Sequence, residues 1–180
     1  MRIEIIPVGP IDSSVLEYLV NLLAERFNTD VEVGPRIPIE LFQINELRKQ
    51  YLSTSILQAI RDLRRRDRRV SLAIADVDLY VSPLNFVFGE ADPANGVAVI
   101  SLARLRRIVH GSQNDRVLLL ERAGKEAVHE LGHVFHLEHC IQPRCVMFFS
   151  NSVADTDFKK NEFCDDCRSM LTFHASSGKS

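Results

Sequence analysis

The residues from His129 to Cys145 read HELGHVFHLEHCIQPRC. This stretch begins with a His-Glu-x-x-His motif, in which His129 and His133 lie four residues apart. On an α-helix that spacing places both imidazoles on one face, close enough to bind one metal ion. Glu130 lies about 100° around the helix from His129, so it can lie beside the ion without ligating it and act on a water molecule. The stretch therefore predicts a catalytic metal site on a helix.

A catalytic zinc needs three protein ligands and one open position, so a third ligand has to follow the motif. In a continuing helix His136 would lie about 10.5 Å from His129 along the axis, too far for Zn–N bonds of about 2.0–2.1 Å. His139 comes within reach if the helix ends near residue 136 and the chain turns back. We therefore expect His139 to be the third ligand and His136 the turn residue. The alternatives for His136 are a polar group at the rim of the cleft and a competing ligand.

Four cysteines follow in a pattern that is typical of a closed zinc site. Cys140 and Cys145 are separated by four residues, and Cys164 and Cys167 by two, which is the spacing of a four-thiolate tetrahedron. The alternatives are two disulfides or reduced cysteines in the core. A closed tetrahedron has no open position, so we expect this second zinc to be structural. It would fix the chain directly after His139 and so orient that ligand.

Composition limits the class of protein. The chain has 180 residues, 46% of them hydrophobic, and a net charge of -2, which indicates one domain with a core and does not favour nucleic acid or an anionic membrane as partner. The N-terminus is too short and too charged for a signal peptide, and no apolar run reaches the roughly 20 residues that span a bilayer. We expect a cytoplasmic protein with no membrane or nucleic-acid partner, in which clustered cysteines are more often metal ligands than disulfides. The basic run Arg61–Arg69 reads as a solvated helix end rather than a nucleic-acid patch, because no aromatic residue interleaves it.

Hydrophobic periodicity predicts the main elements. Helices are expected from a capping box at Ser14 and Glu17 to about residue 27, over residues 53–66, and from about residue 115 to the turn at 136. Strands are expected at 2–8, 31–33, 70–75, 85–90 and 96–101. Residues 34–50 are predicted to be irregular.

The motif resembles the metzincin zinc signature, His-Glu-x-x-His-x-x-Gly-x-x-His. Cys140-x4-Cys145-x-Met147, followed by Cys164-x2-Cys167, resembles the archaemetzincin branch of those metallopeptidases, and residues 78–90 are also similar to that family. The sequence departs from the pattern at position 136, where His replaces the Gly that permits a left-handed backbone. A non-Gly residue there costs about 1–2 kcal/mol, although His is enriched in that region.

The resemblance implies a zinc metallopeptidase with a compact metzincin-like zincin fold of the α/β (α+β) class. It implies one catalytic domain of two parts: residues 1–138 with a mixed twisted sheet and the active-site helix, and a small C-terminal subdomain, residues 139–180, with the third histidine and the second zinc. Met147 would form the Met-turn beneath the histidines. The segment 85–90 would be an edge strand that pairs with a peptide or protein substrate. The substrate-binding candidates are Asn85, Phe86, Val87 and Phe88; the alternative is an ordinary hairpin strand with buried phenylalanines.

The expected chemistry is hydrolysis of a peptide bond. Zinc lowers the pKa of a bound water toward about 7 and polarises the substrate carbonyl, while Glu130 takes the proton of the water and delivers it to the leaving amine. Some metzincins place a Tyr just after the Met to stabilise the oxyanion; Phe148 and Phe149 stand here instead, so that role is unfilled. Some members of the family act preferentially as aminopeptidases, which remove residues from the N-terminus of a peptide. The alternative function is a zinc-stabilised binding or regulatory protein with a latent or inactive peptidase site.

Overall fold

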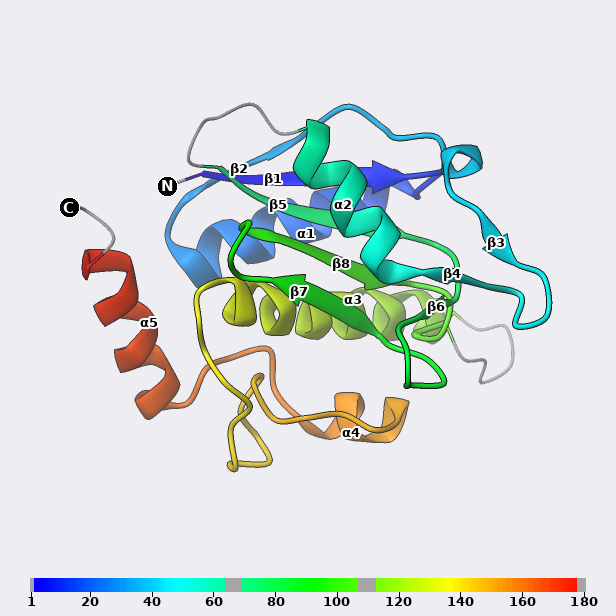
Figure 1. Ribbon diagram of the computed structural model, residues 1–180. Helices are drawn as coiled ribbons and strands as arrows, with labels where there is room; N and C mark the ends of the chain where they lie inside the picture. The colour runs from blue at the N-terminus through cyan, green and yellow to red at the C-terminus, as the bar shows by residue number, and fades with distance from the viewer. Residues whose placement is uncertain (1, 64–68, 107–112, 178–180) are drawn as a thin grey trace.

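A five-stranded mixed sheet forms the centre of the computed structural model, which describes residues 2–63, 69–106 and 113–177 (Figure 1). Its strand order is β2-β1-β5-β8-β7. The parallel strands are β1 (Arg2–Val8), β2 (Asp30–Val33), β5 (Arg69–Ala75) and β8 (Val97–Ser101), and β7 (Gly89–Asp92) is an antiparallel edge strand. The strands predicted at 2–8, 31–33, 70–75 and 96–101 are confirmed within a residue or so.

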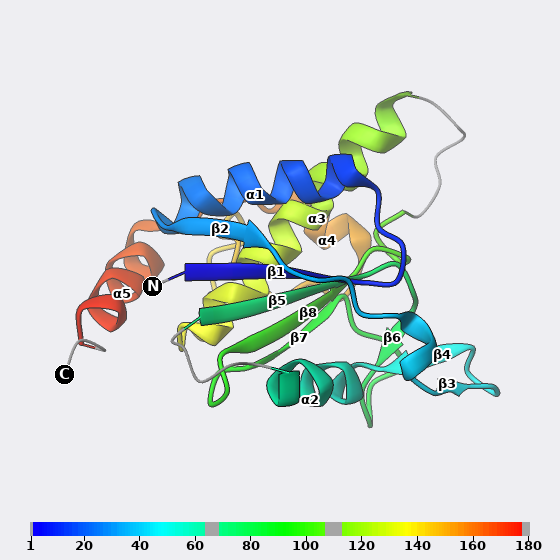
Figure 2. The same cartoon turned by 90° about the horizontal axis from the view of Figure 1, so that it is seen from above.

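Helices cover both faces of the sheet (Figure 2). α1 (Ser13–Phe27) and α3 (Gln113–Val134) lie on one face and α2 (Ser53–Leu63) on the other. Because alternate residues of a strand point to opposite faces, Leu72 of β5 packs into the core under α1 and α3, whereas Ala73 packs under α2. β5 and β8 are buried almost throughout, as expected for parallel strands covered on both sides.

A second, small sheet lies at one end of the first (Figure 1). It contains three short strands in the order β3-β4-β6, namely β3 (Ile44–Asn45), β4 (Gln50–Leu52) and β6 (Leu79–Tyr80). A 3₁₀ turn (Ile39–Leu41) precedes it. Two further helices follow Cys145, namely α4 (Val153–Phe158) and α5 (Asp165–Ser177), and α5 contains Cys167. The prediction of an irregular segment at 34–50 is therefore wrong for β3 and β4.

Two other predictions about local structure need correction. The strand expected at 85–90 begins only at Gly89, because its partner β8 ends at Ser101, whose N–H donates to the Phe88 carbonyl at 2.7 Å. Residues 85–88 instead belong to the connection between β6 and β7, residues 81–88, in which Val87 forms an isolated β-bridge with Leu79. The capping box expected at Ser14 is also wrong: α1 begins one residue earlier, and Asp12 caps it by accepting a hydrogen bond from Ser14 N at 2.9 Å. Asp ranks with Ser as a preferred N-cap.

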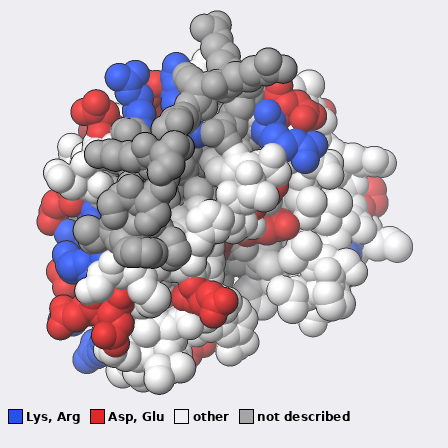
Figure 3. All heavy atoms as spheres, turned by 60° about the vertical axis from the view of Figure 1, so that its left-hand side comes forward, with Lys and Arg blue, Asp and Glu red and all other residues white. Residues whose placement is uncertain are grey.

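The basic run Arg61–Arg69 lies largely outside the described residues, which end at Leu63 and resume at Arg69. The last residues of the helix predicted at 53–66 lie outside them too. On the face of the molecule in Figure 3, acidic and basic side chains lie close to one another among the residues drawn in colour. Among the helices that the structure describes, none is both long and apolar enough to cross a membrane.

Candidate active site

The helix that carries the His-Glu-x-x-His motif ends in a tight turn at the predicted place. α3 ends at Val134, and His136 has a left-handed backbone with φ 63°. The His136 N–H donates to the His133 carbonyl at 2.8 Å, and the Leu137 N–H donates to the Gly132 carbonyl at 3.0 Å. These two bonds form a Schellman motif, whose left-handed position is usually Gly. The turn predicted at His136 is confirmed, and it directs the chain back toward the helix.

This turn brings the three predicted zinc ligands together. The Nε2 atom of His133 lies 3.1 Å from that of His129 and 3.2 Å from that of His139. His136, the alternative ligand, is not part of this group among the described residues. Nitrogens bound at about 2.0–2.1 Å to a tetrahedral ion lie roughly 3.3 Å apart, so the separations suit one zinc ion.

Hydrogen bonds fix which nitrogen of each helical histidine faces the others. His129 Nδ1 lies 2.8 Å from the Val146 carbonyl, and His133 Nδ1 lies 2.7 Å from the Leu137 carbonyl. A carbonyl only accepts, so each Nδ1 carries the proton and each Nε2 has a lone pair. Two Nε2 atoms that both have lone pairs repel each other and cannot form a hydrogen bond. A cation bound between them removes this repulsion. The donor set therefore fits a metal that prefers imidazole nitrogen.

The surroundings keep these imidazoles neutral, which is the form that binds metal. Burial lowers the pKa of His129 well below its usual range, and the nearby Lys159 ammonium lowers it further. Burial is also the main cause that lowers the pKa of His133 and of His139.

Glu130 lies beside this group, in a cavity of about 440 Å³. Its side chain is buried and lies directly under the edge strand, since a Cβ atom on Gly89 would be 2.5 Å from Glu130 Cγ. Burial raises the pKa of Glu130 well above its usual range, and the Glu126 carboxylate raises it further. A raised pKa suits a carboxyl group that must first accept a proton and later donate it.

The four substrate-binding candidates line the same cavity as the histidines. The described lining residues are Val81, Leu84, Asn85, Phe86, Val87, Phe88, Gly89, Glu90, Glu126, His129, Glu130, His133, His139, Phe149, Ser150 and Asn151. Sequence reasoning did not single out Glu126, although it lies one helical turn before Glu130 and so on the same face. Met147 is fully buried, and its thioether packs against Gly132. Gly132 lies on α3 between His129 and His133.

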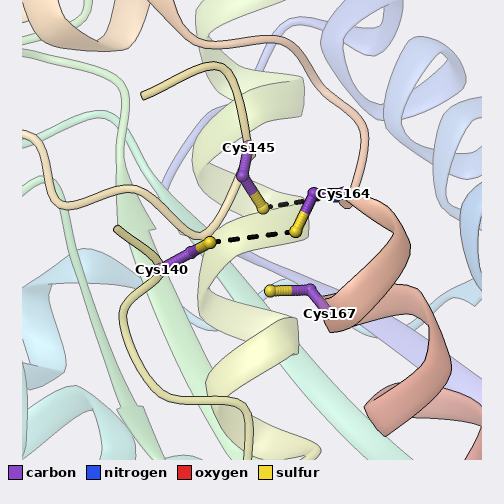
Figure 4. A group of neighbouring side chains, drawn as sticks. All are labelled: Cys140, Cys145, Cys164 and Cys167. Carbon is purple, nitrogen blue, oxygen red and sulfur yellow. Dashed lines mark hydrogen bonds between the residues drawn. The ribbon is translucent and has the colours of Figure 1, made fainter. Parts of the chain in front are cut away.

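The four cysteines converge as a second group, shown in Figure 4. All four are free thiols, and their sulfur atoms lie within 4.8 Å of one another. Cys140 Sγ lies 3.8 Å from Cys164 Sγ, which matches the roughly 3.8 Å between thiolates bound at about 2.3 Å to a tetrahedral zinc. Backbone N–H groups of Gln142 and Cys164 donate to Cys140 Sγ and Cys145 Sγ, each at 3.4 Å. These donors favour thiolates, so the set also fits zinc.

Comparison with known proteins shows the family of this chain. Residues 15–172 match the model of Peptidase family M54. The chain belongs to this family, the archaemetzincins. It is 44% identical over 175 residues to an archaemetzincin of Pyrococcus furiosus, covering 94% of this chain and 91% of that protein. It is 42% identical over 171 residues to one of Methanocaldococcus jannaschii, covering 95% and 93%.

Solved structures confirm the fold. The crystal structure of archaemetzincin from Archaeoglobus fulgidus, complexed with malonate, matches with a TM-score of 0.81 and 41% identity, covering 94% of this chain and 99% of that one. That of archaemetzincin from Methanopyrus kandleri matches with a TM-score of 0.83 and 31% identity, covering 98% and 96%. The predicted α/β metzincin-like fold and the archaemetzincin resemblance are thus confirmed. The family is one of zinc metallopeptidases.

Proposed function

We propose that this archaemetzincin hydrolyses peptide bonds in peptides or proteins at a zinc held by His129, His133 and His139, with Glu130 as general base and acid. The observation that carries this proposal is the convergence of three Nε2 atoms beside a cavity that Glu130 also lines. A binding protein would not need a buried carboxylate at that place.

The residues of the chain have distinct roles in this reaction. When bound, zinc acts as a Lewis acid that polarises the substrate carbonyl and lowers the pKa of water. Glu130 takes a proton from the attacking water and delivers it to the leaving nitrogen as the C–N bond breaks. The side of β7 that faces away from β8 offers main-chain groups to an extended substrate, and Asn85, Phe86, Val87 and Phe88 contact its side chains.

We also propose a second, structural zinc at Cys140, Cys145, Cys164 and Cys167. Four thiolates complete a tetrahedron and leave no open position for a substrate. The site belongs to the C-terminal part, residues 139–180, which supplies His139 and Met147, whereas residues 1–138 supply the sheet and α3. Cysteines without disulfides are typical of a reducing compartment, which supports the cytoplasm as the place of action. The net charge of -2 does not favour nucleic acid or an anionic membrane as partner, and we propose neither.

One experiment tests the function. Zinc per chain and hydrolysis of a diverse peptide library are measured for wild type and Glu130→Gln. We expect two zinc ions in both proteins and cleavage only in wild type. Comparing free with acetylated N-termini in the library shows whether the enzyme is an aminopeptidase. Two zinc ions without cleavage in either protein would support the alternative, a zinc-stabilised binding protein with a latent site, which the absence of a Tyr after Met147 favours.

A further inference from the structure

The wall of the active-site cavity includes a segment with little regular structure of its own. Residues 84–88 belong to the connection between β6 and β7, residues 81–88, and all five line the cavity. A main-chain hydrogen bond of 3.0 Å, from Val87 N–H to the Leu79 carbonyl, ties the segment to β6. The side chain of Leu84 is about half exposed. The Phe88 carbonyl is also fixed, by the Ser101 N–H at 2.7 Å. The later residues of the wall are thus anchored to β6 and β8, and the position of Leu84 and Asn85 depends on what else holds them.

Side chains of the β3–β4 hairpin hold those residues. Arg48 Nη2 donates to the carbonyls of Leu84 at 3.0 Å and Asn85 at 3.2 Å, and Gln50 Nε2 donates to the Asn85 carbonyl at 3.0 Å. Arg48 Nε also donates to Gln50 Oε1 at 3.0 Å, so the two side chains support each other. The hairpin lies beside β6 at one end of the sheet (Figure 1).

The geometry of Arg48 makes it suited to this task. Its guanidinium lies over the ring of Tyr80, with Cζ 4.6 Å from the ring centroid, and the phenolic oxygen of Tyr80 accepts a hydrogen bond from Asn45 at 3.3 Å. Stacking on Tyr80 fixes the plane of the guanidinium. The planar guanidinium can then donate to several acceptors at once, here the carbonyls of Leu84 and Asn85. Lys at this position would supply charge without the fork.

We propose that Arg48 and Gln50 are positioning residues for substrate binding: they hold the wall at residues 84–88 where an extended peptide can pack against it. The inference rests on the proposed peptidase function, but concerns residues that lie outside the cavity and act through Leu84 and Asn85. A wall that is fixed before the substrate arrives has less conformational entropy to lose on binding. Arg48 and Gln50 do not touch Glu130 or the histidines in the described structure, so the chemical step does not depend on them.

Kinetics separate this role from a merely structural one. Loss of uniform binding raises KM and leaves kcat unchanged. Because Arg48 is partly exposed to solvent, we expect Arg48→Met to raise KM for the best-cleaved library peptide about fivefold, or about 1 kcal/mol, with kcat within twofold of wild type. Gln50→Met should act in the same direction, and Arg48→Lys should recover part of the loss. The matched control is Lys49→Met, since Lys49 is the neighbouring cation and pairs with exposed Glu46.

Hydrogen exchange tests the anchor without using activity. In the zinc-loaded proteins, amides of residues 81–90 should exchange faster in Arg48→Met and Gln50→Met than in wild type or Lys49→Met, while α3 stays unchanged. If the exchange of that segment in Arg48→Met and Gln50→Met equals that of wild type, the inference is overturned. Faster exchange with an unchanged KM would also overturn it. So would a fall in kcat that accompanies loss of zinc. A wild type that cleaves no peptide would refute the proposed function instead, and the exchange data alone would then decide whether Arg48 holds the wall.

Discussion

A buried ion pair between α3 and the end of α4 offers a sharp test of the packing around the site. Lys159 Nζ lies 3.1 Å from Glu126 Oε1, and the two side chains are 0% and 3% exposed. Glu126 also accepts a hydrogen bond from Thr156 Oγ1 at 2.9 Å, and Lys159 Nζ is 3.4 Å from the Phe148 carbonyl. The pair thus joins the active-site helix to the chain that follows Met147.

Replacing one partner leaves the other buried without its counter-ion. Such changes cost about 3–5 kcal/mol. Lys159→Met leaves Glu126 with the Thr156 hydroxyl, so we expect the lower end, about 3 kcal/mol. For a chain of this length, 1 kcal/mol shifts the midpoint of thermal unfolding by about 2–4 °C, which predicts a fall of about 6–12 °C. The double variant Glu126→Gln, Lys159→Met removes both charges of the pair, so neither is left without its counter-ion, and it should recover most of the loss.

The coupling between Lys159 and Glu126 is measured by thermal unfolding of four proteins: wild type, Lys159→Met, Glu126→Gln and the double variant. Saturating zinc is needed, because metal that binds the folded state adds to apparent stability. Lys160→Met is the matched control, since Lys160 is the next residue and is exposed; we expect its midpoint to stay within about 2 °C of wild type. If Lys159→Met were as stable as Lys160→Met, Lys159 would reach solvent in solution, and the buried pair would be refuted.

Three further substitutions probe the site itself. Gly89→Ala should reduce peptide hydrolysis about 100-fold with zinc content unchanged, because its Cβ would displace Glu130 and a displacement of about 1 Å can have that effect; full activity would contradict the close approach. His136→Gly should retain both zinc ions and change stability by less than about 2 kcal/mol, whereas His139→Ala should lose the catalytic zinc; metal analysis with the opposite result would make His136 the ligand. Cys164→Ser should lower zinc per chain and, in a chelator titration, release the remaining zinc more easily than wild type; equal zinc content would refute the second site.

The central sheet and the metal groups were predictable because their signals are local. β5 is apolar apart from Arg69 and Ser71, and β8 apart from Ser101. The spacing of His129 and His133 identifies one helical face without knowledge of the fold. The turn at His136 followed from distance alone, since His139 reaches the other histidines only if the helix stops. The spacing of the cysteines likewise needed no tertiary information.

The contacts that support the site were not predictable in the same way. Arg48 and Glu126 look like ordinary charged residues in the sequence. The wall residues that Arg48 holds, and the partners of Glu126, lie 30 or more residues away. β3 and β4 contain two and three residues, too few for a period of two to emerge. The start of β7 at Gly89 depended on where its partner β8 ends, which only the register of the sheet reveals.

The segment after the turn explains why the two metal groups lie next to each other. The Val146 carbonyl accepts from His129 Nδ1 and so orients one ligand, and His139 is bonded directly to Cys140. The Cys140 N–H in turn donates to the Met147 carbonyl at 2.9 Å, which closes the loop from 140 to 147 beneath α3. The end of this loop, Val146 and Met147, is buried in the main core, and the proposed thiolate site at Cys140 and Cys145 would fix the rest. Two of the three histidines are therefore oriented by this loop or attached to its start, and the proposed structural zinc would help to set the geometry of the catalytic site without touching it.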